Sequence, residues 1–250
     1  MARPPRCRRG PATRRLCPRQ HRAHRPLRHP LGVGALAPVT ELAGLSRLQF
    51  EPHERVGALG GTFDPLHRAH LHLADAAAQA LELDRLILIP AGDPWRKHDR
   101  PVTPSTHRLA MTLAAVDARQ GGLEVSDIEV NRDGPTYTLD TVRALRDRGA
   151  KQLWWIMGAD AVLDLPHWHR PNEILTCARI AAAVRPGAEL ERRQLDRIVP
   201  GLGRWLDWVP MEPIDLSASE IRDRIRRGED VAEDVPAAVL EYVRRHRLYL

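Results

Sequence analysis

Residues 60–70, with the sequence GGTFDPLHRAH, restrict the fold of this chain more than any other stretch. The apolar residues 56–59 before it predict a strand, and the Ala- and Leu-rich segment from about His67 to Leu83 predicts a helix. The glycine pair and the proline between them predict a tight turn. A strand, a loop and a helix start in this order leave backbone N–H groups unpaired at the positive end of a helix dipole, where a phosphate can bind.

His67 and His70 lie three residues apart, so both imidazoles are expected on one side of the first helical turn. Two other interpretations exist for such a pair, namely an exposed helical pair and a metal site. Zinc requires a third and a fourth ligand, and no Cys or Glu-x-x-His pattern near the pair supplies them. From these residues alone a phosphate-binding site and an exposed helical pair both remain open, because a tight strand-to-helix turn needs glycine in either case.

From residue 56 onward, short apolar runs alternate with amphipathic segments, a pattern typical of a parallel sheet covered by helices. Further strands are expected at residues 85–90, 123–126, 128–130, 152–157, 179–184 and 205–209. Further helices are expected at residues 105–119 with Ser105 as the cap, at residues 139–148, from Ser217 onward and at residues 236–246. We therefore predict an α/β fold, a doubly wound Rossmann-like parallel sheet with a small helical C-terminal part.

In a parallel sheet the loops that follow the strands lie at one edge, where ligands bind. The basic residues 96–98 follow a predicted strand and either meet an anionic substrate or form a solvated loop. Tyr137, at the start of a helix, either stacks on a ligand or joins the core. Asp160 follows a central strand, and Trp168 lies between two histidines in the next loop, where an indole needs a packing or stacking partner.

A second helix start is predicted at residues 217–222, with the sequence SASEIR. Hydroxyl groups and Arg222 at a helix N-terminus can form a second anion site. The alternative is that Ser217 is an ordinary N-cap and Arg222 an ordinary surface residue.

Composition separates an N-terminal extension, residues 1–54, from the predicted domain, residues 55–250. Residues 1–40 carry ten arginines and no Lys, Asp or Glu, whereas the remaining 210 residues hold 28 basic and 32 acidic side chains. We expect this Arg- and Pro-rich extension to be disordered. It is a nucleic-acid or membrane-surface tether, a targeting peptide or a translation of codons upstream of the real start, and we favour the last. The domain has a single cysteine, Cys177, which suits a reducing compartment, and no apolar run approaches a membrane span.

Residues 60–70 resemble the GGTFDPxHxGH signature of the nucleotidyltransferases, with Ala69 where that family usually has Gly. Residues 217–222 resemble the second signature of these enzymes, SxxxIR. Together with the strings at residues 90–97, 135–138, 157–160, 168 and 185–187, they are similar to the bacterial nicotinate-mononucleotide adenylyltransferases over residues 55–250. The resemblance implies a cytoplasmic enzyme that transfers AMP from ATP to nicotinate mononucleotide, with Mg²⁺ carried by the ATP.

The resemblance also implies roles for individual residues. Catalysis is assigned to His67, His70 and Arg222. ATP is expected to contact Gly60, Gly61, Thr62, Phe63, His67, His70, Gly158, Asp160, Arg185, Ser217, Ile221 and Arg222. The mononucleotide is expected to contact Lys97, Thr136, Tyr137, Thr138 and Trp168.

Two alternatives remain for the function. A related adenylyl- or cytidylyltransferase would use another phosphate acceptor, such as nicotinamide mononucleotide or pantetheine phosphate. A protein of a different class would bind nucleic acid through the arginine-rich extension and use the body as a nucleotide sensor. We expect the enzyme, with no membrane partner and no specific nucleic-acid partner.

Overall fold

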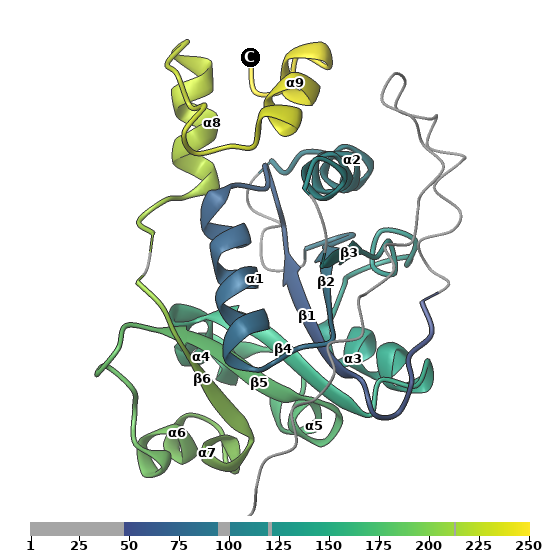
Figure 1. Ribbon diagram of the computed structural model, residues 1–250, viewed down its shortest axis with the longest axis vertical. Helices are drawn as coiled ribbons and strands as arrows, with labels where there is room; N and C mark the ends of the chain where they lie inside the picture. The colour runs from purple at the N-terminus through teal and green to yellow at the C-terminus, as the bar shows by residue number, and fades with distance from the viewer. Residues whose placement is uncertain (1–47, 95–100, 120–121, 213) are drawn as a thin grey trace, which may run out of the picture. The chain divides into compact units, whose positions relative to one another are not determined.

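The computed structural model describes residues 48–94, 101–119, 122–212 and 214–250. Within these ranges the strands form a six-stranded sheet in the order β3-β2-β1-β4-β5-β6, and all neighbouring strands are parallel (Figure 1). The strands are β1 (Arg55–Gly61), β2 (Arg85–Pro90), β3 (Leu123–Val125), β4 (Gln152–Gly158), β5 (Arg179–Val184) and β6 (Leu206–Pro210). The predicted doubly wound parallel sheet is confirmed.

Helices connect the strands and follow the last one. They are α1 (Arg68–Ala80), α2 (Ser105–Asp117), α3 (Thr138–Asp147), α4 (Ala159–Asp164), the 3-10 helix η4 (Leu165–His167), α5 (Pro171–Cys177), α6 (Arg192–Ile198), α7 (Leu202–Trp205), α8 (Ala218–Arg226) and α9 (Ala237–Arg245). The chain builds the sheet outward from β1 through β2 and β3, then returns to place β4 on the other side of β1. The carboxyl ends of β1 and β4 therefore flank the point where the strand order reverses, which is where open α/β sheets bind ligands.

Side chains that alternate along each strand divide the core between the two faces of the sheet. On β1, Val56 and Ala58 join a cluster with side chains of α3, α5 and α6, whereas Leu59 joins a second cluster with side chains of α1, α2, α8 and α9. On β4, Trp155 and Trp154 divide in the same way. Because both faces are covered, the central strands are apolar on both sides, as their continuous apolar runs predict.

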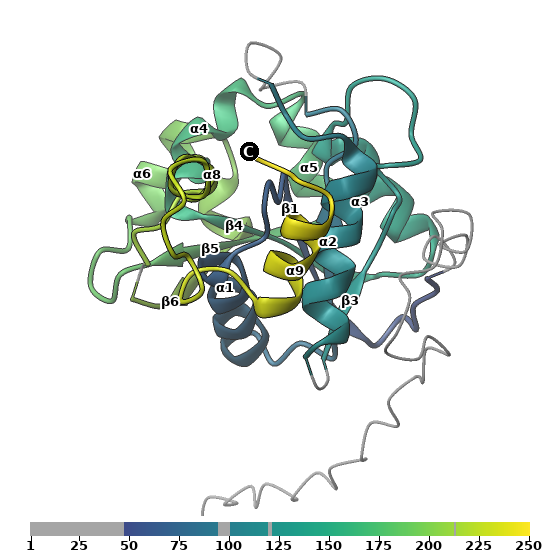
Figure 2. The same cartoon turned by 90° about the horizontal axis from the view of Figure 1, so that it is seen from above.

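The C-terminal helices α8 and α9 complete the second of these clusters. Ile221 of α8 and Val239 of α9 are fully buried in it. Figure 2 shows α9 lying beside α2, and a hydrogen bond of 2.9 Å joins His107 Nδ1 of α2 to the Tyr242 hydroxyl of α9. The helical C-terminal part is thus packed on the same core as the sheet.

Two details of the predicted secondary structure are wrong. Ser105 does not cap α2: the helix begins at Ser105 with Pro104 as its N-cap, and no side chain caps it. Residues 128–130 form a turn rather than a strand. The turn is closed by Asn131, whose backbone N–H donates to the Asp127 carbonyl at 3.0 Å and whose side-chain amide donates to the Asp127 carboxylate at 2.8 Å.

The folded body also starts earlier than the sequence boundary at residue 55. Phe50 is 6% exposed and belongs to the first core cluster, and its N–H donates to the Arg148 carbonyl at 2.9 Å. Residues 48–54 therefore belong with the domain, because a buried aromatic side chain anchors them. The prediction of a disordered extension otherwise falls on residues 1–47, which lie outside the described residues. In the described part of the chain, no helix has the length and apolar character that a membrane crossing requires.

Candidate active site

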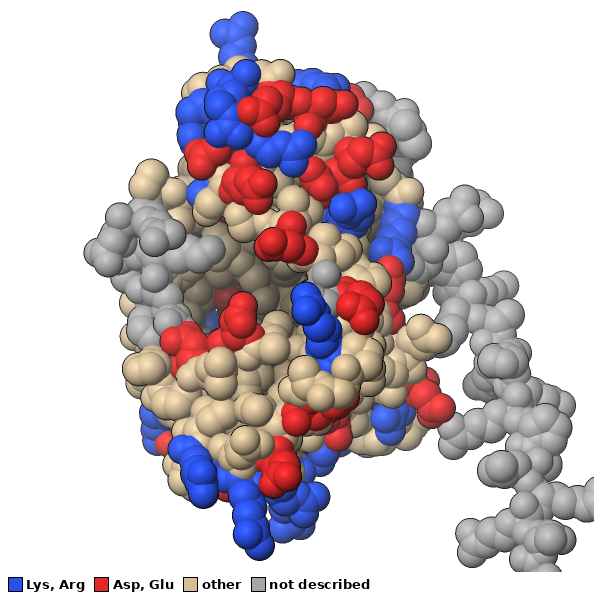
Figure 3. All heavy atoms as spheres, turned by 90° about the vertical axis from the view of Figure 1, so that its left-hand side faces the viewer, with Lys and Arg blue, Asp and Glu red and all other residues tan. Residues whose placement is uncertain are grey.

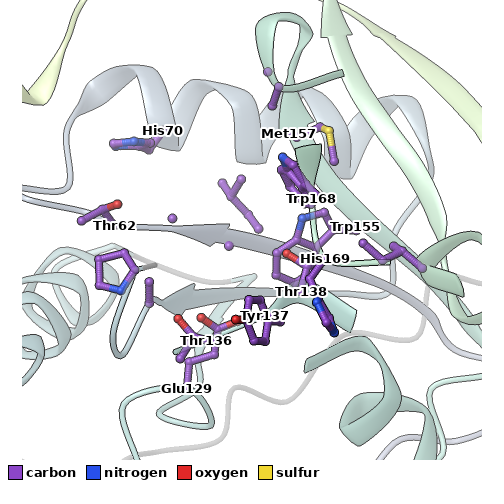
Figure 4. A pocket seen from close by; sticks show the side chains of 18 of the residues that line it. Thr62, His70, Glu129, Thr136, Tyr137, Thr138, Trp155, Met157, Trp168 and His169 are labelled. Carbon is purple, nitrogen blue, oxygen red and sulfur yellow. The ribbon is translucent and has the colours of Figure 1, made fainter. Parts of the chain in front are cut away.

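A cavity of about 370 Å³ opens at the carboxyl ends of β1 and β4, at the reversal point of the sheet. It is lined by Leu59, Gly60, Gly61, Thr62, His70, Leu73, Ala91, Pro94, Glu129, Thr136, Tyr137, Thr138, Trp155, Met157, Gly158, Ala161, Trp168, His169 and Ile174. Figure 4 shows His70 and Thr62 at one end and Trp168, His169 and Tyr137 at the other. The face drawn in Figure 3 is hollowed, and acidic and basic side chains are interspersed around the hollow.

The first end of the cavity is the loop between β1 and α1 together with the start of that helix. His70 occupies the first turn of α1, and its Nδ1 accepts a hydrogen bond of 3.3 Å from the backbone N–H of His67. The ring of Phe63 stands edge-on to the His70 ring at 5.0 Å. Because Nδ1 is an acceptor, the proton of a neutral His70 lies on Nε2. The loop thus orients an imidazole N–H donor at the cavity.

His67 is the N-cap of α1, and its ring lies 3.7 Å from the His70 ring, centroid to centroid. The predicted pairing of the two imidazoles is confirmed. His67 is only 4% exposed, it does not line the cavity, and its Nδ1 has no hydrogen-bond partner among the described residues. Burial lowers the pKa of His67 to about 4, against a smaller opposing effect of Asp234. His67 is therefore neutral at physiological pH and acts on His70 through its backbone N–H.

The helix start at α8 reaches the same loop. Ser217 caps α8 through a hydrogen bond of 3.1 Å from the Glu220 N–H to its hydroxyl oxygen, which is the N-cap role that the sequence left as the alternative. Arg222 Nη1 donates to the Asp64 carbonyl at 2.8 Å and lies 3.8 Å from an oxygen of the Asp64 carboxylate. Arg222 and His70, 152 positions apart in sequence, thus hold opposite ends of one short loop, residues 64–70.

The second end of the cavity is aromatic. The rings of Tyr137 and His169 are stacked, with centroids 4.3 Å apart and an interplanar angle of 26°. Trp168 is half-buried, and its indole N–H donates to the Asp164 carboxylate at 3.3 Å, which fixes the plane of the ring. Trp155 of β4 completes this wall. Flat rings with fixed orientations can hold an aromatic ligand by stacking.

The floor between the two ends carries a buried carboxyl group. Glu129 is 6% exposed and accepts a hydrogen bond of 2.7 Å from the Thr141 hydroxyl. Burial raises the pKa of Glu129, and Thr141 and Arg132 oppose that shift. Gly92 lies against this residue so closely that a Cβ would meet the Glu129 carbonyl oxygen at 2.1 Å. Glycine is therefore required where the loop after β2 crosses the floor.

A buried cation, Arg108 of α2, joins the loops around the cavity. Its guanidinium donates to the backbone carbonyls of Thr62, Gly92 and Thr103, each at 2.8 Å, and the side chain is 1% exposed. Burial lowers the pKa of Arg108, and the carboxylate of Asp64 opposes this shift. One side chain thus fixes the loop after β1 to the loop after β2.

The structure brings together nine of the residues that the sequence singled out. Those that line the cavity are Gly60, Gly61, Thr62, His70, Thr136, Tyr137, Thr138, Gly158 and Trp168. Those that do not line it are Phe63, His67, Asp160, Arg185, Ser217, Ile221 and Arg222. Lys97 lies outside the described residues.

The structure explains why Ile221 does not line the cavity. Its side chain is fully buried in the core and its N–H donates to the Ser217 carbonyl at 3.1 Å, so neither is presented to a ligand. Phe63 is also buried, at 1% exposed, and contacts the site through the His70 ring. Asp160, Arg185 and Ser217 are exposed.

Sequence reasoning missed Arg108, Asp64 and Glu129. A signal for Arg108 existed, because residues 108, 111, 112 and 115 lie on one helix face, and the other three are buried Met, Thr and Ala. An arginine on such a face indicates a buried cation that needs acceptors. Among the described residues, no group of three or more His, Cys, Asp or Glu is placed to hold a metal ion.

Comparison with known proteins gives concordant results. The family model described as cytidylyltransferase-like matches residues 58–224. A relative from Roseiflexus sp. (strain RS-1), named "Probable nicotinate-nucleotide adenylyltransferase", is 41% identical over 194 residues, which cover 78% of this chain and 97% of the relative. A relative of the same name from Thermomicrobium roseum is 40% identical over 196 residues, 78% of this chain and 91% of the relative.

Solved structures support the fold. The Plasmodium falciparum nicotinic acid mononucleotide adenylyltransferase complexed with NaAD matches with a TM-score of 0.65 and 16% identity, over 79% of this chain and 98% of that one. The same enzyme complexed with APC matches with a TM-score of 0.63 and 15% identity over the same shares. At these identities the likeness concerns the arrangement of strands and helices.

Proposed function

Because the chain belongs to the cytidylyltransferase-like family, with nicotinate-nucleotide adenylyltransferases as its relatives, we propose that it transfers AMP from ATP to nicotinate mononucleotide. The products are nicotinate adenine dinucleotide and pyrophosphate, which places the reaction in NAD biosynthesis. The observation that carries this proposal is the cavity itself, which runs from the His70 helix start to the wall of Tyr137 and Trp168. One end has the donors that phosphates accept from, and the other has the flat rings that a pyridine stacks on.

The reaction requires the protein mainly to align the two substrates and to stabilise negative charge. An oxygen of the mononucleotide phosphate forms a bond to the α-phosphorus of ATP while the bond from that phosphorus to the β-bridging oxygen breaks and pyrophosphate leaves. The attacking phosphate monoester has a second pKa of about 6, so it is mostly dianionic at neutral pH and needs no general base. Catalysis therefore comes from alignment of two anions and from donors that stabilise charge on the transferring phosphoryl group.

We assign the phosphate contacts to the residues at the two helix starts. His70 donates from Nε2 to the α-phosphate region, with its ring held by the His67 N–H and by Phe63. Arg222, which contacts Asp64 in the same loop, turns toward the β- and γ-phosphates when ATP is bound. The N–H groups at the start of α1 add a positive dipole end.

The mononucleotide occupies the aromatic end. Its ring is proposed to stack beside Trp168 and Tyr137, and the hydroxyl and backbone groups of residues 136–138 are proposed to read its carboxylate. The phosphate of this substrate then faces the loop after β1, in line with the α-phosphorus. Lys97 remains a proposed contact to that phosphate.

Mg²⁺ is proposed to arrive with ATP. The donors that face the phosphate end are imidazole and backbone nitrogens, which suit phosphate oxygens rather than a hard cation. The ion would thus be held by the triphosphate and water, and it would neutralise charge on the leaving pyrophosphate. We place the enzyme in the cytoplasm, where ATP is available and where Cys177, a free thiol, would stay reduced.

The test is a parallel pyrophosphate-release assay with ATP and three acceptors, namely nicotinate mononucleotide, nicotinamide mononucleotide and pantetheine phosphate. We expect the highest kcat/KM with nicotinate mononucleotide, and a dinucleotide product of the corresponding mass. Turnover of pantetheine phosphate without turnover of nicotinate mononucleotide would overturn the proposal. A raised KM for nicotinate mononucleotide in a Trp168→Ala variant, at unchanged KM for ATP, would support the placement of the acceptor ring.

A further inference from the structure

Tyr249, the second-to-last residue of the chain, reaches the phosphate-binding loop. The hydroxyl of Tyr249 donates a hydrogen bond of 2.7 Å to the carboxylate of Asp64, which lies 185 positions earlier in sequence. The sulfur of Met111 lies 3.7 Å from the same hydroxyl and is the weaker acceptor. Burial and the neighbouring charge of Asp64 raise the pKa of Tyr249, so the hydroxyl keeps its proton. Tyr249 is thus a donor at every physiological pH.

Asp64 is the point where three parts of the chain meet. It is 3% exposed, and its carboxylate accepts hydrogen bonds from Tyr249 and from the Thr103 N–H at 3.3 Å. The Arg222 guanidinium forms a longer ion pair with the carboxylate, at 3.8 Å. The same guanidinium donates to the Asp64 carbonyl at 2.8 Å. A buried carboxylate is costly without hydrogen-bond donors, so when it loses one donor it interacts more strongly with those that remain.

The backbone of the C-terminal segment shows that its position is specific. After α9 ends, Arg247 and Tyr249 adopt left-handed φ values of 50° and 67°, a conformation that non-glycine residues rarely adopt. Leu248 and Tyr249 pack against the second core cluster, and the Leu248 N–H donates to the Val243 carbonyl at 3.0 Å. Such strained residues persist only where their surroundings hold them in place.

We propose that Tyr249 is a positioning residue for the nucleotidyl transfer: it satisfies the Asp64 carboxylate and so leaves the Arg222 guanidinium available to the triphosphate. This inference rests on the proposed function. If ATP binds as proposed, Asp64 and the triphosphate compete for one guanidinium, because both are anions. With Tyr249 bound, Arg222 is held by the neutral carbonyl at 2.8 Å and only loosely by the carboxylate at 3.8 Å. Without the hydroxyl, the carboxylate draws Arg222 into a closer ion pair and withdraws it from ATP.

The variant Tyr249→Phe removes only the hydroxyl. We expect its kcat/KM for ATP to fall about tenfold, the size of a coupling between residues in one hydrogen-bond network, with the KM for the mononucleotide unchanged. In an Arg222→Ala background, the same substitution should change ATP kinetics by less than about twofold, because the guanidinium on which it acts is gone. A full tenfold effect in that background would overturn the inference, since Tyr249 would then act independently of Arg222.

A matched control separates positioning from packing. Tyr242, on α9, is also largely buried and uses its hydroxyl to bond His107 at 2.9 Å, but it does not contact Asp64. We expect Tyr242→Phe to leave ATP kinetics unchanged, with any loss of thermal stability similar to that of Tyr249→Phe. Equal loss of ATP kinetics in both variants would mean that the C-terminal segment acts by general packing. A chain that ends at Leu248 is the second variant; it loses the packed ring as well as the hydroxyl, so its loss in ATP kinetics should be at least that of Tyr249→Phe.

Titration calorimetry of Mg²⁺-ATP binding gives a readout that does not involve the acceptor. We expect Tyr249→Phe to raise the Kd for ATP by the same factor as its effect on kcat/KM. If the Kd for ATP differs between wild type and Tyr249→Phe as expected but the wild type does not adenylylate nicotinate mononucleotide, the acceptor assignment is wrong and the inference stands. If the Kd is the same in wild type and variant while the wild type turns over, the proposed function stands and the inference is wrong.

Discussion

The two ends of the cavity are built in different ways. At the phosphate end, the cavity wall comes from one contiguous loop and helix start, where backbone groups and the imidazole of His70 face the cavity. Arg222 of α8 lies outside the wall and contacts this loop at Asp64. The aromatic end combines residues 136–138, Trp155 and residues 168–169, which come from three separate segments of the chain. A polyanion can be recognised by local backbone geometry, whereas a flat ring needs side chains that the whole fold brings together.

This difference predicts different kinetic consequences. Donors at the phosphate end meet charge that shifts during phosphoryl transfer, so their removal should lower kcat. Rings at the aromatic end contact a part of the acceptor that does not react, so their removal should raise the KM for that acceptor with little change in kcat. The predictions below test this division, and they run from the largest expected effect to the smallest.

The largest effect is expected for His70→Ala. Loss of the oriented Nε2 donor should lower kcat by about 10²–10³-fold, the usual effect of removing one donor to a transition-state oxyanion. The fold should persist, because His70 is half-buried and the core of α1 is formed by Leu73, Ala74 and Ala77. Steady-state kinetics and thermal melting on the same sample provide the measurement.

The matched control for this variant is His72→Ala, the same substitution two residues further along α1. His72 does not line the cavity, so its loss should leave kcat within about twofold of wild type. Near-normal turnover of His70→Ala would refute the assigned role. Equal losses in both variants would indicate damage to the helix rather than loss of a donor.

Arg108 couples the two ends of the cavity. It fixes the carbonyl of Thr62 at the phosphate end and that of Gly92 in the loop that crosses the floor. Arg108→Met should lower the free energy of unfolding by about 3 kcal/mol or more, because three buried carbonyls lose their donor. Urea denaturation measures this effect. Arg119→Met, which breaks the exposed pair with Asp75, should cost about 1 kcal/mol or less.

Arg108→Met protein that still folds should also show changed KM values for both substrates. A variant with an altered KM for one substrate alone would mean that the loops after β1 and β2 are positioned separately. A ΔΔG of unfolding equal to that of Arg119→Met would contradict the buried role of the guanidinium.

The third effect concerns pH and tests whether the pair of histidines at the phosphate end carries charge. The pKa of His67 is lowered to about 4 in the folded protein from 6.5, so the unfolded chain binds this proton more tightly. Stability is therefore lost as the pH falls from 6.5 toward 4, and the loss is complete below 4. By pH 5 this linkage should have removed about 2 kcal/mol relative to pH 7.5.

His67→Gln removes that titration. Urea unfolding at pH 7.5 and pH 5 should show a pH-dependent loss smaller by about 2 kcal/mol in the variant than in wild type. The same loss in both proteins would mean that His67 is not buried as a neutral imidazole. In that case the pKa of His67 in the folded protein would be close to its value in the unfolded chain.

The same division between the two ends explains what the sequence predicted. The strand, turn and helix around residues 60–70 depend on local periodicity and on glycine and proline, so the position of the phosphate end follows from a single stretch. The sheet could also be predicted, because its buried strands are apolar runs such as residues 85–90. Residues 128–130 show the limit of sequence patterns, since the short alternating stretch Ile-Glu-Val next to Asp127 and Asn131 closes into a turn.

Non-local contacts explain the rest. Arg108 acts through carbonyls 16 and 46 positions away, and Asp64 binds a tyrosine 185 positions away. A local sequence pattern therefore predicts neither role. Gly60 shows how one residue can have a second purpose. Its predicted roles were a tight turn and contact with ATP, and the structure adds that a Cβ there would meet the ring of Trp155 at 2.3 Å. The first motif therefore also makes room for the aromatic wall.

The smallest effect is expected at the aromatic end. Trp168→Ala should raise the KM for nicotinate mononucleotide about tenfold, because an aromatic contact contributes about 1.4 kcal/mol. The KM for ATP and the kcat should change by less than about twofold, since the His70 end is untouched. Initial-rate measurements with each substrate varied in turn give both constants.

Trp205→Ala is the control, because Trp205 is 37% exposed, packs against the guanidinium groups of Arg179 and Arg204, and does not line the cavity. It should leave both KM values unchanged. A rise in the KM for ATP equal to that for the mononucleotide in Trp168→Ala would show that the two substrates share the aromatic wall. The division of the cavity into a backbone-built phosphate end and a side-chain-built aromatic end would then be wrong, because one ring would serve both ligands.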